Sequence, residues 1–284
     1  MPSFPIIDSH VHLWDPVKYR LPWLDKLPPI NRLVDLNTYA DATAGIDVER
    51  LVYLQVEVGP AYALLEARDL VELSRQAPII AGVVPWAPLE YGDQARYFME
   101  ELVKLGPEIK GVRRIVQDEP DPAFCLQPGF VRGNQILAEL GLSSDICCTY
   151  LQLAENVELA RRCPETSFVL DHIAKPNIRG GQFEPWGSQM RELASLPNVV
   201  CKLSGVVTEA DHQNWTMEDI KPYVLHTLEV FGEDRVMFGS DWPVSTLAAD
   251  YPRWVDAVET LTADLSDAAK RKLWSGNAKR FYRL

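Results

Sequence analysis

The sequence predicts an α/β fold of the (β/α)8 type, a TIM barrel with a Pro- and aromatic-rich loop after strand one. Eight short apolar runs rich in β-branched residues recur along the 284 residues, with amphipathic helical patterns between them. One strand and helix about every 35 residues is close to the spacing of such barrels. No G-x-G-x-x-G motif follows an early strand, which removes the main support for a doubly wound open sheet.

The elements can be placed in order along the chain. The clearest helix lies over residues 220–231, where apolar side chains recur at the spacing of one helix face. Similar patterns predict a helix over 64–74 and a terminal helix over 268–284. Residues 13–36 form the long loop, which either packs over one end of the barrel or acts as a substrate lid. The expected strands are residues 6–7, 51–58, 79–84, 109–116, 142–150, 168–171, 199–203 and 235–239.

Strands and helices alternate with no linker-like tract, so we expect residues 1–284 to form a single domain.

The five cysteines are an odd number without a C-x-x-C pair, which is typical of reduced thiols in the cytoplasm. The N-terminus has neither the basic start nor the apolar stretch of a signal peptide. The chain has no run of about 18 apolar residues, so the sequence predicts no membrane-spanning helix.

The net charge is −12, from 28 basic and 40 acidic residues, and the pI is about 4.9. Such a surface has no basic stripe to neutralise phosphates, which argues against nucleic acid and anionic membranes as partners. We therefore expect a small-molecule partner. The composition leaves the oligomeric state open, a homo-oligomer included.

Titratable side chains follow several of the predicted strands. Strand one runs into His10 and His12, whose i, i+2 spacing puts both rings on one face. His172 and Asp241 stand at the ends of strands six and eight. In a parallel barrel the carboxyl ends of the strands carry the active site, so these four residues are the candidate catalytic groups. His212 lies in a loop from which it could reach them.

These residues resemble the amidohydrolase superfamily of barrel hydrolases, in its amidohydrolase-2 branch. Within that branch the chain is similar to the dicarboxylate lactonases and to sugar lactonases that open L-fucono- and L-rhamnono-lactones. Ser144 and Glu57 depart from the family pattern. The matching segments are the H-x-H of residues 10–12, G-V-R of 111–113, the F-x-x-G-x-x-x-L-x-x-x-G-L-x-x-D stretch of 130–145, V-L-D-H of 169–172 with K-P of 175–176, K-L-S-G of 202–205, G-S-D-W-P of 239–243 and G-N-A of 276–278.

The resemblance implies hydrolysis of a sugar-acid (aldono-) lactone. Asp241 is the expected general base for the attacking water, and it would return the proton to the leaving alkoxide. His10, His12 and His172 would polarise the carbonyl directly or through a divalent ion. The candidate substrate-binding residues are Arg113, Arg114, Lys175, Trp14, Trp86 and Trp242, with Lys202 a weaker candidate.

The candidate metal ligands are His10, His12, His172 and Asp241. Binuclear members of the superfamily need a further histidine on strand five, and residues 141–152 contain neither His nor Lys. We therefore expect at most one ion, Zn²⁺ or Mn²⁺, that is weakly held or dispensable.

Three other functions remain open. One is a metal-dependent decarboxylase of the same superfamily, and a second is a barrel that binds a ligand without catalysis. The third is an oxidoreductase barrel, for which no cofactor motif is visible.

Overall fold

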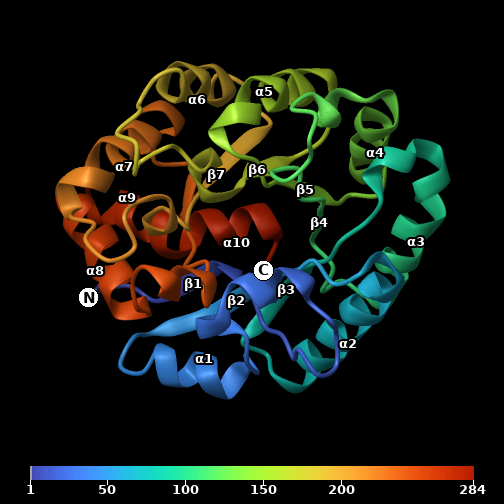
Figure 1. Ribbon diagram of the computed structural model, residues 1–284, viewed down its shortest axis with the longest axis horizontal. Coiled ribbons are helices and arrows are strands. Elements are labelled where there is room, and N and C mark those ends of the chain that lie inside the picture. The colour runs from blue at the N-terminus through green and yellow to red at the C-terminus, as the bar shows by residue number, and fades with distance from the viewer. Residues whose placement is uncertain (1) are drawn as a thin grey trace.

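The protein is described by a computed structural model covering residues 2–284, in which parallel strands are ringed by helices (Figure 1). Two sheets, β1–β2–β3 and β4 to β8, are each parallel throughout. Bridges between Val83 and Ile109 and between Val11 and Trp242 join the sheets at both edges. The strands are β1 (Ile6–Val11), β2 (Val48–Leu54), β3 (Ile80–Val84), β4 (Gly111–Arg113), β5 (Ser143–Ile146), β6 (Phe168–Leu170), β7 (Val199–Leu203) and β8 (Val236–Phe238).

This closed sheet confirms the predicted barrel, and a helix follows each strand. Several helices begin at a capping side chain: Asp35 accepts a hydrogen bond from the Thr38 amide, and Asp250 from the Arg253 amide. The helices are α1 (Leu36–Ala42), α2 (Ala63–Gln76), α3 (Arg96–Leu105), α4 (Pro128–Glu139), α5 (Leu153–Arg162), α6 (Trp186–Ala194), α7 (Met217–Phe231), α8 (Tyr251–Leu261), α9 (Asp267–Arg271) and α10 (Asn277–Tyr282).

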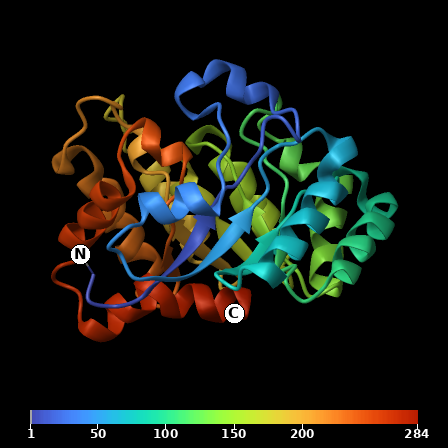
Figure 2. The ribbon, with the colours of Figure 1, turned by 90° about the horizontal axis from the view of Figure 1, so that it is seen from below.

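An apolar layer lies inside the barrel on the side that α10 covers. Val52 and Leu54 of β2 and Met237 of β8 point inward and pack with Tyr282 of α10. Figure 2 shows the C-terminal helix across one end of the barrel and the segment after β1 over the opposite end. One end of the barrel is therefore plugged, and the strand carboxyl ends face the other.

The predicted strand boundaries are wrong in places. β1 continues to Val11 through Asp8, Ser9 and His10, which are fully buried although polar, so an apolar run could not reveal them. β4 ends at Arg113 and β5 at Ile146, because the chain leaves the sheet there to form the site. The predicted terminal helix is broken between α9 and α10 by a π-helical turn, Lys272–Gly276.

The segment after β1 lies over one end of the barrel, as expected, and folds back on itself there. The backbones of Trp14 and Val34 exchange hydrogen bonds of 2.8 and 2.9 Å, which close its two ends. Two short 3₁₀ helices, Pro22–Lys26 and Pro28–Ile30, form its tip. The Trp23 indole Nε1 donates to the carbonyl oxygen of Val56 at 2.8 Å, which docks the tip beside the end of β2.

All five cysteines are buried free thiols, as predicted. Among residues 2–284, none of the helices combines the length and the apolar content that a bilayer crossing requires.

Candidate active site

Four of the predicted residues converge on one point at the carboxyl ends of the strands. His10 lies on β1 and His12 directly follows that strand, while Asp241 follows β8, the neighbouring strand. The Asp241 Oδ1 atom lies 3.7 Å from His10 Nε2, 3.4 Å from His12 Nε2 and 3.8 Å from His172 Nε2. Groups from the ends of two strands, β1 and β6, therefore surround a carboxylate at the end of a third, β8.

Hydrogen-bond partners assign the ring protons of two of these histidines. His12 Nδ1 lies 2.9 Å from the carbonyl oxygen of Leu54, which can only accept, so His12 Nδ1 carries the proton. Arg113 Nη1 can only donate, and it lies 3.1 Å from His10 Nε2. The proton of neutral His10 is then on Nδ1, which lies 3.3 Å from the acceptor Asp171 Oδ1 and also 3.3 Å from Lys202 Nζ. The His10 Nε2 lone pair therefore accepts from Arg113, while the His12 Nε2 lone pair faces His10 Nε2 at 3.2 Å, beside Asp241.

A left-handed turn fixes His172. The residues His172 to Lys175 all have positive φ, at 53°, 48°, 60° and 46°. His172 Nδ1 is 2.9 Å from the Ser204 hydroxyl, which sets the orientation of the ring. The next residue, Gly205, has φ +57°, and a Cβ there would lie 2.6 Å from His172 Nδ1 and 2.9 Å from Asp241 Oδ2. This position therefore requires glycine.

A buried layer of charge supports the histidines from below. Lys202 is fully buried, and its Nζ lies 2.6 Å from Asp145 Oδ2, 3.0 Å from Asp171 Oδ1 and 3.3 Å from His10 Nδ1. Arg113 Nη1 lies 3.3 Å from Asp171 Oδ2. Two cations thus balance two carboxylates beneath the site. Lys202 is not a surface lysine, because it points into the barrel from β7.

The charge states follow from burial and these neighbours. Burial lowers the pKa of His10 well below 6.5, and the Lys202 charge lowers it further. Burial also lowers the pKa of His12 and of His172, so all three rings are neutral at pH 7. Burial alone would raise the pKa of Asp241, but the neighbouring His172 and the positive charge of Lys175 hold it below 3.8. A carboxylate is therefore available as an acceptor at neutral pH.

This donor set fits one divalent cation. Ligand atoms of His10, His12 and Asp241 lie within 4.8 Å of one another, and two imidazole lone pairs with a carboxylate suit Zn²⁺ or Mn²⁺. A second group, His10, Asp171 and His172, satisfies the same distance. Lys202 and Arg113 already neutralise Asp171 there, so a second ion would meet two fixed positive charges.

A cavity of about 470 Å³ opens above these groups. Arg113 and Lys175 line it as cations, and Glu57 and Asp118 as carboxylates. Trp23 from the segment after β1 forms part of its wall, so this segment covers the site.

Sequence reasoning missed Trp23, Gln117 and Asp118, because only the folded chain brings them to the strand ends. Asp171 could have been found, since it directly precedes His172 in the matching V-L-D-H segment.

Several predicted substrate-binding residues lie elsewhere. Arg114 points away from the barrel and pairs with Glu90 and Glu119, because neighbouring strand residues face opposite ways. His212 is exposed, and its Nε2 lies 2.9 Å from the Thr208 carbonyl oxygen. The three predicted tryptophans do not line the cavity above Asp241: Trp14 lines a second cavity, Trp86 lines a third beside Arg114, and Trp242 is buried against Tyr39.

Replacing Arg113 by Met should lower kcat/KM about 10- to 150-fold, because losing a charged hydrogen-bond partner costs about 1.5–3 kcal/mol. The matched Arg114→Met change should alter kcat/KM less than about threefold, since its partners are outside the cavity. Steady-state kinetics of both variants, with thermal melting to check folding, measure this. Unchanged kinetics for Arg113→Met together with damage from Arg114→Met would contradict it.

The chain has relatives over its whole length. The Amidohydrolase family model (Amidohydro_2) matches residues 7–284. An L-fucono-1,5-lactonase of Burkholderia ambifaria is 32% identical, over 98% of this chain and 95% of the relative. An L-rhamnono-gamma-lactonase of Scheffersomyces stipitis is 24% identical, with both chains fully covered.

A solved structure is also similar throughout. It is a Burkholderia multivorans amidohydrolase with bound Zn, at a TM-score of 0.88 and 33% identity, covering 99% of this chain and all of that one. This agreement in sequence and fold confirms the resemblance drawn from the strand-end motifs. The chain belongs to the amidohydrolase family, in the branch that its Amidohydro_2 family model describes.

Proposed function

We propose that this amidohydrolase opens the ring of a sugar-acid lactone. The observation that carries the proposal is the convergence of three imidazoles on the Asp241 carboxylate, beside Arg113 and Lys175. The relatives named as lactonases that match nearly the whole chain support it. A converging set of buried titratable groups in a cavity is typical of catalysis and not of binding alone.

The reaction can be derived from the chain's own groups. A water beside Asp241 gives its proton to the carboxylate while its oxygen bonds to the lactone carbonyl carbon. Arg113 and Lys175 donate to the substrate oxygens, which stabilises the charge that develops on the carbonyl oxygen. The ring C–O bond then breaks, and Asp241 returns the proton to the alkoxide. The product is an open-chain hydroxy acid, which releases a proton at neutral pH.

Neutral His10 and His12 cannot polarise the carbonyl directly, because their Nε2 atoms carry lone pairs. A divalent ion bound to His10, His12 and Asp241 would supply the Lewis acid that polarises the carbonyl. Arg113 already donates to His10 Nε2, and Lys175 and Lys202 add further positive charge. These cations weaken the affinity of the site for a metal.

Metal analysis and activity after chelation test whether the site binds an ion weakly and can work without it. We expect at most one ion per purified chain and activity within about tenfold of the untreated enzyme after exhaustive chelation. Loss of an essential Lewis acid, worth several kcal/mol, would instead lower kcat on the order of a thousandfold. Two tightly bound ions would contradict the single site, while complete loss that added metal restores would contradict only the weak requirement.

The cavity favours a neutral, polyhydroxylated substrate. Arg113 and Lys175 serve the lactone carbonyl, while the Glu57 and Asp118 carboxylates accept hydrogen bonds from hydroxyl groups and repel a substrate carboxylate placed beside them. Gln55 fixes Glu57, since its Nε2 donates to Glu57 Oε1 at 3.0 Å. A sugar lactone therefore suits this cavity better than a dicarboxylate lactone does.

A panel of substrates with a pH indicator tests the proposal. L-Fucono-1,5-lactone, L-rhamnono-γ-lactone and 2-pyrone-4,6-dicarboxylate should be compared, each corrected for spontaneous opening. We expect acid release from at least one sugar lactone and little from the dicarboxylate. Preference for the dicarboxylate would contradict the argument from Glu57 and Asp118. CO₂ release from aromatic acids without lactone opening would favour a decarboxylase instead.

A further inference from the structure

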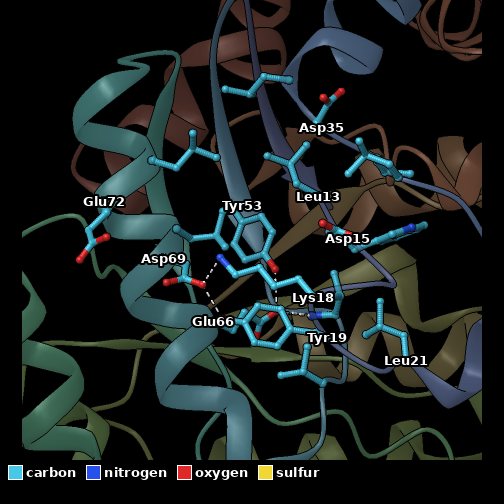
Figure 3. Close-up of a pocket in the computed structure, with 18 of the residues that line it drawn as sticks. Leu13, Asp15, Lys18, Tyr19, Leu21, Asp35, Tyr53, Glu66, Asp69 and Glu72 are labelled. Atoms are coloured by element: carbon cyan, nitrogen blue, oxygen red, sulfur yellow. Dashed lines mark hydrogen bonds and ion pairs between the residues drawn. The ribbon is translucent and has the colours of Figure 1, made fainter.

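A second cavity, of about 480 Å³, lies on the outer side of β2. Figure 3 shows it between α2, which carries Glu66, Asp69 and Glu72, and the segment after β1, which carries Lys18 and Tyr19. Val56 is the one residue it shares with the lining of the cavity above Asp241, within the part of the chain that the structure describes. Tyr53 points into it because alternate residues of β2, Val52 and Leu54, fill the barrel.

Glu66 is the distinctive group in this cavity. Its side chain is 2% exposed, and its Oε1 accepts hydrogen bonds from the Tyr53 hydroxyl at 2.6 Å and the Val56 amide at 3.2 Å. Oε2 has no hydrogen-bond partner among residues 2–284. A buried carboxylate oxygen without a partner is rare, because its lost hydration is then uncompensated. A bound group that donates to Oε2 would remove this deficit.

The charge of the lining indicates what that group is. Five carboxylates line the cavity, and Lys18 is the one cationic side chain among the described lining residues. Lys18 is already paired, with its Nζ 2.6 Å from Asp69 Oδ2, and that same carboxylate also accepts from the Tyr19 hydroxyl. The cavity therefore carries an excess of negative charge. The carboxylates are Asp15, Asp35, Glu66, Asp69 and Glu72.

The remaining lining is mostly apolar, with Asn37 and Gln76 as polar exceptions. Leu13, Val34, Val56 and Leu70 are nearly fully buried, and the indole of Trp14 adds an aromatic surface. An apolar wall around a carboxylate accommodates a hydrocarbon body that bears one positive head. The volume lies within the range of ordinary small-molecule sites.

We propose that this cavity binds a compact organic amine, with its ammonium group donating to Glu66 Oε2 and its hydrocarbon part against the apolar wall. This site is separate from the lactone site and independent of the function proposed there. Burial raises the pKa of Glu66 to about 7, and an ammonium beside it would favour the ionised carboxylate.

Calorimetric titration of the full chain with cyclohexylmethylamine, and with cyclohexylmethanol as its neutral counterpart, tests the proposal. The amine should bind one per chain, at least about tenfold more tightly than the alcohol, because charge-assisted hydrogen bonds are about twice as strong as neutral ones. Equal affinities, or no saturable binding of the amine, would overturn the proposal and leave a bound water as the partner of Oε2.

Two variants locate the effect. In Glu66→Gln the amide oxygen can still accept from Tyr53 and Val56, while an NH₂ group replaces Oε2, so amine affinity should fall at least about tenfold. Glu72→Gln, the same change at an exposed lining residue, should stay within about threefold. Equal affinity of Glu66→Gln and the wild type would refute the assignment. If Glu66→Gln does not fold, crystals of the wild type soaked in the amine decide, since its nitrogen must lie within hydrogen-bond distance of Oε2.

Discussion

Replacing Asp241 by Asn should lower kcat on the best lactone at least about a hundredfold, the low end for a general acid–base group. The amide has the shape of the carboxylate but cannot take a proton from water. Asp241 has φ +58°, a region in which Asn is enriched, so the backbone should be unaffected. The backbone N–H of residue 241 can also still donate to the backbone carbonyl oxygen of His10, at 2.9 Å.

The measurement is single-turnover kinetics beside circular dichroism and denaturant unfolding. Asp264→Asn makes the same change at an exposed turn position and should leave kcat unaltered. Turnover near that of the wild type in Asp241→Asn would exclude Asp241 as the base, whatever the other variants show. If the loss of kcat matches the fraction of protein that is no longer folded, Asp241 has a structural role instead.

Replacing Lys202 by Met should lower the free energy of unfolding by about 3–5 kcal/mol, because it leaves buried carboxylates without their counter-ion. Lys202 and its partners Asp145 and Asp171 have side chains with no exposed area. Arg113 still reaches Asp171, so Asp145 loses most. Urea unfolding at several pH values measures the effect.

A surface lysine provides a matched control. Lys272 Nζ lies 2.6 Å from Glu233 Oε1 and 2.8 Å from Asp234 Oδ1, nearly the distances around Lys202. Since that cluster is open to solvent, Lys272→Met should cost far less stability. A similar loss in both variants would show that burial of the Lys202 cluster is not what matters.

The pH dependence gives a second check on Lys202→Met. Burial raises the pKa of Asp145 to about 6 in the native protein, against 3.8 for an ordinary Asp, and Lys202 opposes that rise. A raised folded-state pKa adds stability below the unfolded value, and this stability is lost as the pH rises through the folded value. The deficit of the variant should therefore be largest above pH 6 and shrink toward pH 4. A deficit independent of pH would contradict the explanation.

The barrel and its central residues could be predicted because each signal was local. His10 and His12 reveal their common face by the i, i+2 spacing alone, and Asp241 stands out as a carboxylate after an apolar strand. The G-V-R and K-L-S-G segments indicated Arg113 and Lys202 as candidate substrate-binding residues. Sequence could not tell that Lys202 points inward, since its burial depends on Asp145, 57 positions away.

Residues that meet only across the barrel were beyond such signals. Trp23 reaches the site because the segment after β1 closes through Trp14 and Val34, and no periodicity encodes that closure. Trp14, Trp86 and Trp242 were predicted to bind substrate from their residue type alone. They lie outside the cavity above Asp241, because residue type does not show where the folded chain places a side chain. Glu66 resembles any acidic residue in the first turn of a helix, and only the packing of α2 on β2 shows that it is buried.

The left-handed turn at His172 bears on attempts to make this protein more heat-resistant. Each left-handed residue costs roughly 1–2 kcal/mol, and four stand in succession. At fully buried Ala174, a change to Gly would relieve that cost but lose a packed methyl worth about 0.8 kcal/mol and add chain entropy of roughly 0.5–1 kcal/mol. Melting temperature would hardly move, although the backbone of the turn that carries His172 would gain conformational freedom. Screening libraries for thermostability alone would therefore not detect a change in the rigidity of this turn.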